Sequence, residues 1–83
     1  MSEPEQSPVH LMDRITTQPD VMGGKPTIRG LRVTVGTILG LLAAGHSIEK
    51  ILQDYPYLEE ADIRAALHYA ARRVEEIELP LGA

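Results

Sequence analysis

The sequence contains no cysteine, tryptophan or phenylalanine, and each absence excludes a class of function. Without cysteine there is no disulfide and no thiolate chemistry, which fits a reducing cytoplasm. The only aromatic residues are 3 tyrosines, too few to form a platform for stacking single-stranded bases. No apolar run approaches the roughly 18 residues of a membrane span, and the acidic, proline-containing start is unlike a signal peptide. We therefore expect a cytoplasmic protein without a membrane segment.

Length and charge indicate the size of the domain and where an anion-binding surface could lie. A chain of 83 residues makes one domain with a small core, so a homodimer that buries additional surface is predicted. The net charge is −4, but it is unevenly distributed. Residues 14–48 contain four basic residues and one aspartate, a balance of +3, which leaves −7 for the remainder. Any anion-binding surface is therefore expected in the N-terminal half, whereas the later helices are acidic.

The composition divides the chain into three parts. Residues 1–12 are polar and proline-containing, with little to bury, and are predicted to be disordered. Residues 13–76 contain the strand and helix patterns and form the predicted folded domain. Residues 77–83 form a C-terminal tail.

Three helices are predicted in the folded domain. Thr34 is placed to cap a very apolar helix over residues 35–44, and Gly45 supplies the left-handed residue that ends it. Ser47 caps a second helix, which stops before Pro56 because proline has no N–H and disfavours helix at the preceding residue.

The third helix is predicted from a second apolar series at helical spacing, formed by Ile63, Ala66, Leu67, Ala70 and Val74. On this pattern Leu67 is expected to be buried. The second and third helices have the dimensions of a helix-turn-helix, although a plain helical hairpin in a core shows the same spacing. In front of the helices, residues 14–17 have the composition of a short strand.

A β-hairpin is predicted just before the first helix. Gly30-Leu31 has the pattern of a two-residue type II′ loop between residues 27–29 and 32–34. In that register Ile28 opposes Val33, and Arg29 opposes Arg32. Two like charges side by side are destabilising unless an anion lies between them. The pair is therefore either an ion-pair site for an intrachain or partner carboxylate, a phosphate clamp, or a solvated surface feature.

No catalytic residue, metal ligand or cofactor site is predicted, and the protein is not expected to be an enzyme. The carboxylates Glu59, Glu60 and Asp62 fall in the first turn of the third helix, where the helix dipole favours negative charge, and no base or nucleophile accompanies them. Gly24-Lys25 resembles the end of a phosphate-binding loop, but Pro26 follows where serine or threonine is required.

Several short motifs in order resemble one small bacterial and archaeal family. They are Gly24-Lys25-Pro-Thr-Ile-Arg-Gly-Leu-Arg-Val-Thr-Val, then Ile38-Leu39, then Gly45-His-Ser-Ile-Glu-Lys-Ile-Leu-Gln-Asp-Tyr-Pro-Tyr-Leu, then Asp62-Ile63 with Ala65-Ala66-Leu67 and Tyr69-Ala70. The family was long described as a domain of unknown function and is similar to the DNA-binding part of VapB-type antitoxins. The resemblance implies a mainly α fold, in which a short N-terminal β-hairpin precedes a three-helix, homeodomain-like helix-turn-helix bundle. It also implies a PIN-domain ribonuclease toxin as partner.

Two functions follow from this resemblance. In the first, the chain is a type II antitoxin that neutralises its toxin and, as a dimer, represses its own operon. The DNA-binding residues would then be Arg14, Lys25, Arg29, Arg32 and Arg64. In the second, it is a dimeric protein-interaction module that does not bind DNA. The tail alternates acids with aliphatic residues and then breaks at Pro80. Its aliphatic residues Ile77, Leu79 and Leu81 are either toxin-binding anchors or part of a frayed helix end.

Overall fold

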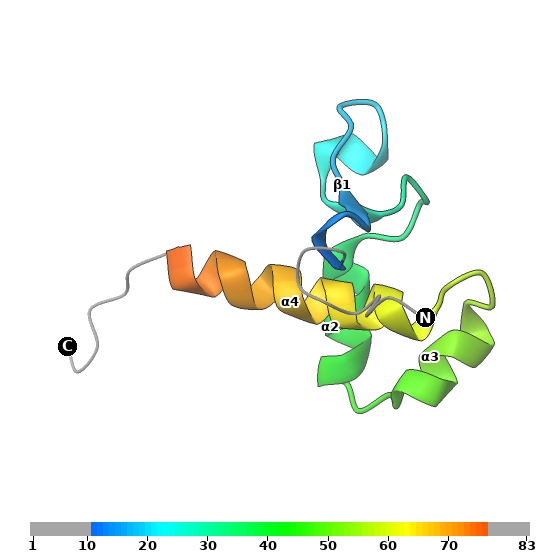
Figure 1. The fold of residues 1–83 in the computed structure, drawn as a ribbon. Coiled ribbons are helices and arrows are strands. Elements are labelled where there is room, and N and C mark those ends of the chain that lie inside the picture. Colours follow the sequence, from blue (N-terminus) through cyan, green and yellow to red (C-terminus); the bar gives the residue numbers. More distant parts are fainter. Residues whose placement is uncertain (1–10, 77–83) are drawn as a thin grey trace, which may run out of the picture.

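The computed structural model describes residues 11–76, in which a two-stranded antiparallel sheet precedes three helices (Figure 1). Strand β1 spans Ile15–Thr16 and β2 spans Thr27–Ile28, with the short 3-10 helix η1, Met22–Gly24, between them. The helices are α2, Val35–Ala43, α3, Ile48–Asp54, and α4, Glu60–Glu76. The predicted mainly α fold with a short N-terminal hairpin and three helices is confirmed. Within these residues, none of the helices combines the length and the apolarity that crossing a bilayer requires.

The sheet is small but is reinforced by side chains. Ile15 pairs with Ile28 and Thr16 pairs with Thr27. The hydroxyl groups of the two threonines lie 3.2 Å apart, and the N–H of Gly30 donates to Thr16 Oγ1 at 3.0 Å. These bonds fix the sheet to the turn that follows it. They help a ladder too short to be stable alone.

The turn after β2 lies one residue earlier than predicted. The N–H of Leu31 donates to the carbonyl of Ile28 at 2.7 Å, and the two central residues, Arg29 and Gly30, have φ of 48° and 74°. Positive φ at both central positions is characteristic of a type I′ turn. Ile28 does pair with Val33, whose carbonyl accepts its N–H at 3.0 Å, as predicted. Arg29, however, belongs to the turn, so the predicted strand pairing of Arg29 with Arg32 is wrong.

The ends of the helices follow the sequence signals. Thr34 Oγ1 accepts the N–H of Thr37, and Ser47 Oγ accepts the N–H of Lys50, each at 3.0 Å. Helix α2 closes with two backbone bonds, from Gly45 to Leu42 and from His46 to Leu41. This is a Schellman motif, and Gly45 provides its left-handed residue with φ of 100°. All three predicted caps are confirmed.

One isoleucine from each of four elements forms the centre of the core. Ile28 of β2, Ile38 of α2, Ile51 of α3 and Ile63 of α4 are all completely buried. Because each comes from a different element, the hydrophobic contact among them joins the sheet to the whole helical unit.

The inward face of α4 differs from the prediction. Ile63 and Ala66 are buried as expected, but Leu67 is 45% exposed and Val74 is 64% exposed. The residues that face the interior are instead Asp62, Ile63, Ala65 and Ala66, with Tyr69 packed against the core. The core covers only the first part of α4, while its C-terminal half extends beyond the other elements (Figure 1). The predicted burial of Leu67 is therefore wrong.

A second, smaller cluster involves the start of the described chain. Leu11 is buried against Ala61 and Ala65, with Ile15 beside it. Leu11 had been assigned to the disordered N-terminal segment, but here it packs on α4 as part of the fold. Residues 1–10 and 77–83 lie outside the described residues.

Candidate functional site

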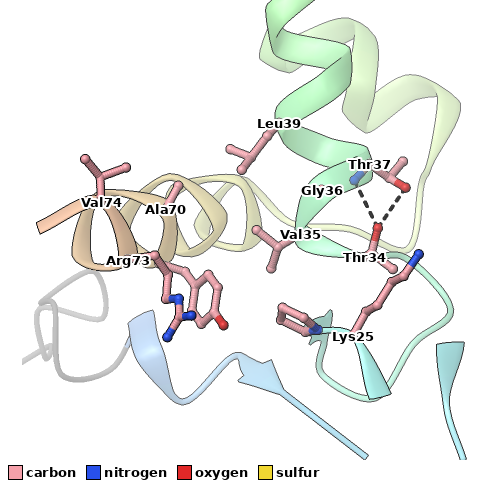
Figure 2. Close-up of a pocket in the computed structure, with 11 residues that line it drawn as sticks. Lys25, Thr34, Val35, Gly36, Thr37, Leu39, Ala70, Arg73 and Val74 are labelled. Carbon is pink, nitrogen blue, oxygen red and sulfur yellow. Dashed lines mark hydrogen bonds between the residues drawn. The ribbon is translucent and has the colours of Figure 1, made fainter. Parts of the chain in front are cut away.

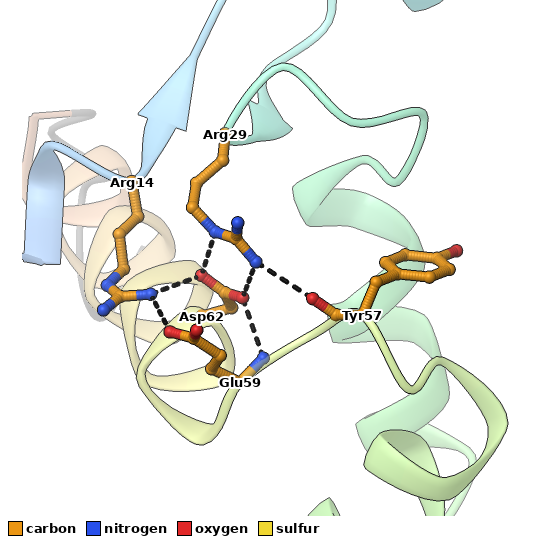
Figure 3. Close-up of polar contacts among 5 residues, drawn as sticks. All are labelled: Arg14, Arg29, Tyr57, Glu59 and Asp62. Atoms are coloured by element: carbon orange, nitrogen blue, oxygen red, sulfur yellow. Dashed lines mark hydrogen bonds and ion pairs between the residues drawn. The ribbon is translucent and has the colours of Figure 1, made fainter.

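The carboxylate of Asp62 lies at the centre of a polar cluster formed by three separate parts of the chain (Figure 3). It accepts two hydrogen bonds from Arg29, from Nε at 3.1 Å and from Nη2 at 2.8 Å. Arg14 donates through Nη1 to Asp62 at 2.9 Å and to Glu59 at 2.8 Å. Nη2 of Arg29 also donates to the carbonyl of Tyr57 at 3.0 Å. The Asp62 cluster therefore connects the residue before β1, the turn after β2 and the start of α4.

Asp62 is fully buried, and its environment keeps it ionised. Burial alone would raise the pKa of Asp62. The hydrogen bonds from Arg29, from the Glu59 N–H and from Arg14 outweigh that effect and lower the pKa below its ordinary value. Hydrogen bonds to Glu59 and Asp62 raise the pKa of Arg14, and the bond to Asp62 raises the pKa of Arg29. The cluster is thus a set of satisfied charges.

The local sequence explains how Asp62 takes this position. Its carboxylate accepts the N–H of Glu59, three residues earlier, at 2.9 Å. A helix-start acid that returns to the N–H of the capping residue is one half of a capping box. The Glu59-x-x-Asp62 spacing was a usable signal for this bond. The helix dipole alone explains an acid at this position but does not predict the burial of Asp62.

The predicted DNA-binding residues fall into two groups in the structure. Arg14 and Arg29 are brought together on Asp62, so the intrachain carboxylate is the alternative that applies to Arg29. Lys25, Arg32 and Arg64 are exposed and do not join this cluster. The predicted toxin-binding residues Ile77, Leu79 and Leu81 lie outside the described residues.

A groove of about 640 Å³ lies between the start of α2 and the C-terminal half of α4 (Figure 2). Its walls are mainly apolar and include Val35, Leu39, Ala70 and Val74. Lys25 stands at the α2 side of the groove, and Arg73 at the α4 side. No sequence pattern predicts this groove, because its walls come from segments far apart in the chain.

Two features of the described residues stand out as candidate sites. No three histidine or acidic residues among residues 11–76 gather closely enough to hold a metal ion. The two prominent features are the Asp62 cluster, whose charges are mutually satisfied, and the groove, which is open and apolar with cations beside it. The groove is the open, apolar surface of the two.

The fold defines a small, mainly helical domain that starts with a β-hairpin. The chain belongs to the family described as "Protein of unknown function (DUF433)", whose model matches residues 15–70. An uncharacterized protein of Sinorhizobium fredii, y4eO, is 45% identical over 56 residues, which are 68% of this chain and 25% of that protein. The chain thus spans only a quarter of that relative.

A solved structure supports the same family assignment. The crystal structure of a DUF433 member protein from Anabaena variabilis is similar, with a TM-score of 0.72 and 33% identity. The similarity covers 80% of this chain and 65% of that one. The family membership expected from the ordered motifs is confirmed, and the described fold is shared with a structure of the same family.

Proposed function

We propose that this chain is a protein-interaction module of the antitoxin type, which binds a ribonuclease partner of the PIN class. The observation that supports it is the pairing of Arg14 and Arg29, two of the predicted DNA-binding residues, within the chain itself. Both are engaged by carboxylates of the same chain. Cations that neutralise a buried aspartate are not available to phosphates without exposing that charge. The folded part is therefore better suited to contact with protein than to a phosphate clamp.

The binding segment in this proposal is the C-terminal tail. It follows α4 directly and carries Ile77, Leu79 and Leu81, with Glu78 and Pro80 between them. A segment of this composition suits a partner with a basic cleft and apolar pockets. The acidic balance of −7 outside residues 14–48 favours association with such a basic partner.

Co-expression with the genomic neighbour tests the proposal. The full chain is expected to co-purify with a PIN-domain protein and to suppress its cleavage of RNA. A chain lacking residues 77–83 should lose both effects, whereas Arg32→Ala, an exposed change in the folded part, should retain them. Normal inhibition by the shortened chain would contradict the role of the tail. The absence of any ribonuclease activity in the neighbour would contradict the antitoxin assignment.

Operator DNA is a second candidate ligand, and the arrangement of α3, the turn and α4 favours it. These elements have the order of a helix-turn-helix, and Arg64 lies exposed on α4. The start of α4 also presents the exposed acids Glu59 and Glu60, which phosphates repel. Protein binding is therefore the first proposal and DNA binding the second.

A further inference from the structure

The C-terminal half of α4 has an apolar side that the rest of the described chain leaves uncovered. Leu67 is 45% exposed and Val74 is 64% exposed, and residues 71–75 are all exposed. Positions 67, 70 and 74 follow helical spacing, so their side chains lie along one side of the helix. Figure 1 shows this half of α4 extending beyond the other elements. An aliphatic surface on a projecting helix is favourable only when another surface covers it.

The same half of α4 forms one wall of the groove. Ala70, Arg73 and Val74 line it together with Val35 and Leu39 of α2 (Figure 2). A surface that is both a groove wall and a projecting apolar helix is suited to self-association. In a two-fold dimer the same patch is used by both copies, so each copy supplies the helix and the groove at once.

The outer face of α2 permits close approach of a second helix. Gly36, Gly40 and Ala43 are exposed and follow one another at helical spacing. Gly36 lines the groove. A Cβ atom built at Gly40 would meet nothing within 4 Å, so the space above this face is open. Without side chains at these positions, an incoming helix can pack near the α2 backbone.

Charge supports the same pairing. Lys25 is exposed and lines the groove, whereas the end of α4 carries the exposed Glu75 followed by Glu76. If α4 of one copy enters the groove of the other with its end at Lys25, Glu75 meets that cation, and the exposed Arg72 and Arg73 of the same helix have to lie outside the contact. Such complementarity selects the relative orientation of two surfaces more than it adds affinity.

We propose that the groove is occupied by the C-terminal half of α4 from a second copy of this chain, which gives a two-fold dimer. Val74 enters the apolar part of the groove, the side of α4 that carries Leu67 packs over the small residues of α2, and the two helix ends exchange ion pairs with Lys25. The contact also extends a hydrophobic core that is small for an independent domain.

Light scattering on the purified chain tests this inference. At micromolar concentration the wild type should show twice the monomer mass, and Val74→Asp should show the monomer mass with unchanged helical circular dichroism. Tyr57→Asp is the matched control, because Tyr57 is 53% exposed but lies in the turn before α4, away from the groove. It should remain dimeric. A monomeric wild type, or a dimeric Val74→Asp, would overturn the proposal.

Gly40→Leu provides an independent variant if Val74→Asp does not fold. A Cβ atom at this position meets nothing within 4 Å in one copy, but a leucine side chain obstructs the approach of a second helix, so the variant should be a monomer. Removal of residues 77–83 should leave the dimer intact. A monomeric wild type whose Val35 and Leu39 amide resonances shift on that removal would instead place the tail in the groove and refute the dimer. Because these measurements use the chain alone, their failure would leave the ribonuclease-binding proposal standing.

Discussion

Arg29 and Asp62 form a bidentate ion pair across 33 positions of sequence, with N–O distances of 2.8 and 3.1 Å. Arg29 forms this pair from the turn after β2, where it has a positive φ of 48°. A non-glycine residue in the left-handed region loses about 1–2 kcal/mol, and the charge-assisted bonds to a buried carboxylate offset that strain. The turn and the start of α4 are therefore coupled through these two side chains.

Arg29→Ala should lower the free energy of unfolding by about 1–3 kcal/mol, because it removes two hydrogen bonds from a buried carboxylate. Urea denaturation would measure the loss. Arg32→Ala is the matched control: Arg32 is exposed just after the same turn, and its replacement should change stability by less than about 0.5 kcal/mol. Equal effects of the two changes would show that the Asp62 pair contributes little.

The stability of the fold should decrease in acid. The folded state lowers the pKa of Asp62, so the unfolded chain binds a proton at higher pH than the folded one. The stabilisation is fully present above the unfolded value of about 3.9 and is lost as the pH falls through the lower, folded value. Melting temperatures measured from neutral pH down into this range should show the decrease. In Asp62→Asn the decrease should be smaller, since the remaining exposed carboxylates have less effect.

Leu67→Ala and Ile63→Ala should have very different effects, although both residues belong to the apolar series of α4. Ile63 is completely buried, whereas Leu67 is 45% exposed. Ile63→Ala should cost about 2–5 kcal/mol through lost burial and a cavity. Leu67→Ala should cost no more than about 1.5 kcal/mol in the monomer, because 45% of its surface remains exposed there and no closed cavity is left. Chemical denaturation at concentrations where the chain is monomeric separates the two.

Gly45→Ala should destabilise the fold by about 1–2 kcal/mol, because φ at this position is 100° and a Cβ atom disfavours that region. Gly45→Asn is the informative comparison. Asparagine adopts left-handed conformations more readily than alanine, so its loss in thermal stability should be smaller. The reverse order of the two variants would argue against the Schellman closure of α2.

If the chain binds operator DNA, the exposed cations should supply the contacts. Arg32→Ala combined with Arg64→Ala should weaken the shift in a gel assay, and wild-type binding should weaken steeply with added salt. Glu60→Ala should leave the shift unchanged or strengthen it, since an exposed acid at the helix start is removed. Arg29→Ala is a poor probe here because it also disturbs the fold. Absence of a shift at low salt with native flanking DNA would favour the pure protein-interaction module.

Local features of the fold could be predicted because their causes lie close together in the sequence. The caps at Thr34 and Ser47 depend on an N–H only three residues away, and the stop before Pro56 depends on the proline itself. The strand β1 and the pairing of Ile28 with Val33 likewise follow from local sequence patterns. The turn was misplaced by one residue because Arg29, which is not a typical residue for positive φ, occupies it.

The exposure of Leu67, the burial of Asp62 and the groove depend on contacts between distant parts of the chain. The apolar series through Leu67 and the buried series through Ala65 and Ala66 lie side by side on α4, and alanine contributes to both. Only the packing against the other elements selects between them. The partners of Asp62 lie 33 and 48 positions away, so periodicity carries no information about its burial. The groove likewise requires that residues 25–26, 34–39 and 69–74 meet in space.

The Asp62 cluster has a consequence for how this unit can be joined to other sequences. A fragment that begins at α2 would retain three helices but would lose Arg14 and Arg29. Its interior would then hold a carboxylate whose remaining described donor is the Glu59 N–H. The helical part is therefore not autonomous. In a fusion or a domain graft, the junction belongs ahead of Leu11, and a boundary between β2 and α2 should yield insoluble protein.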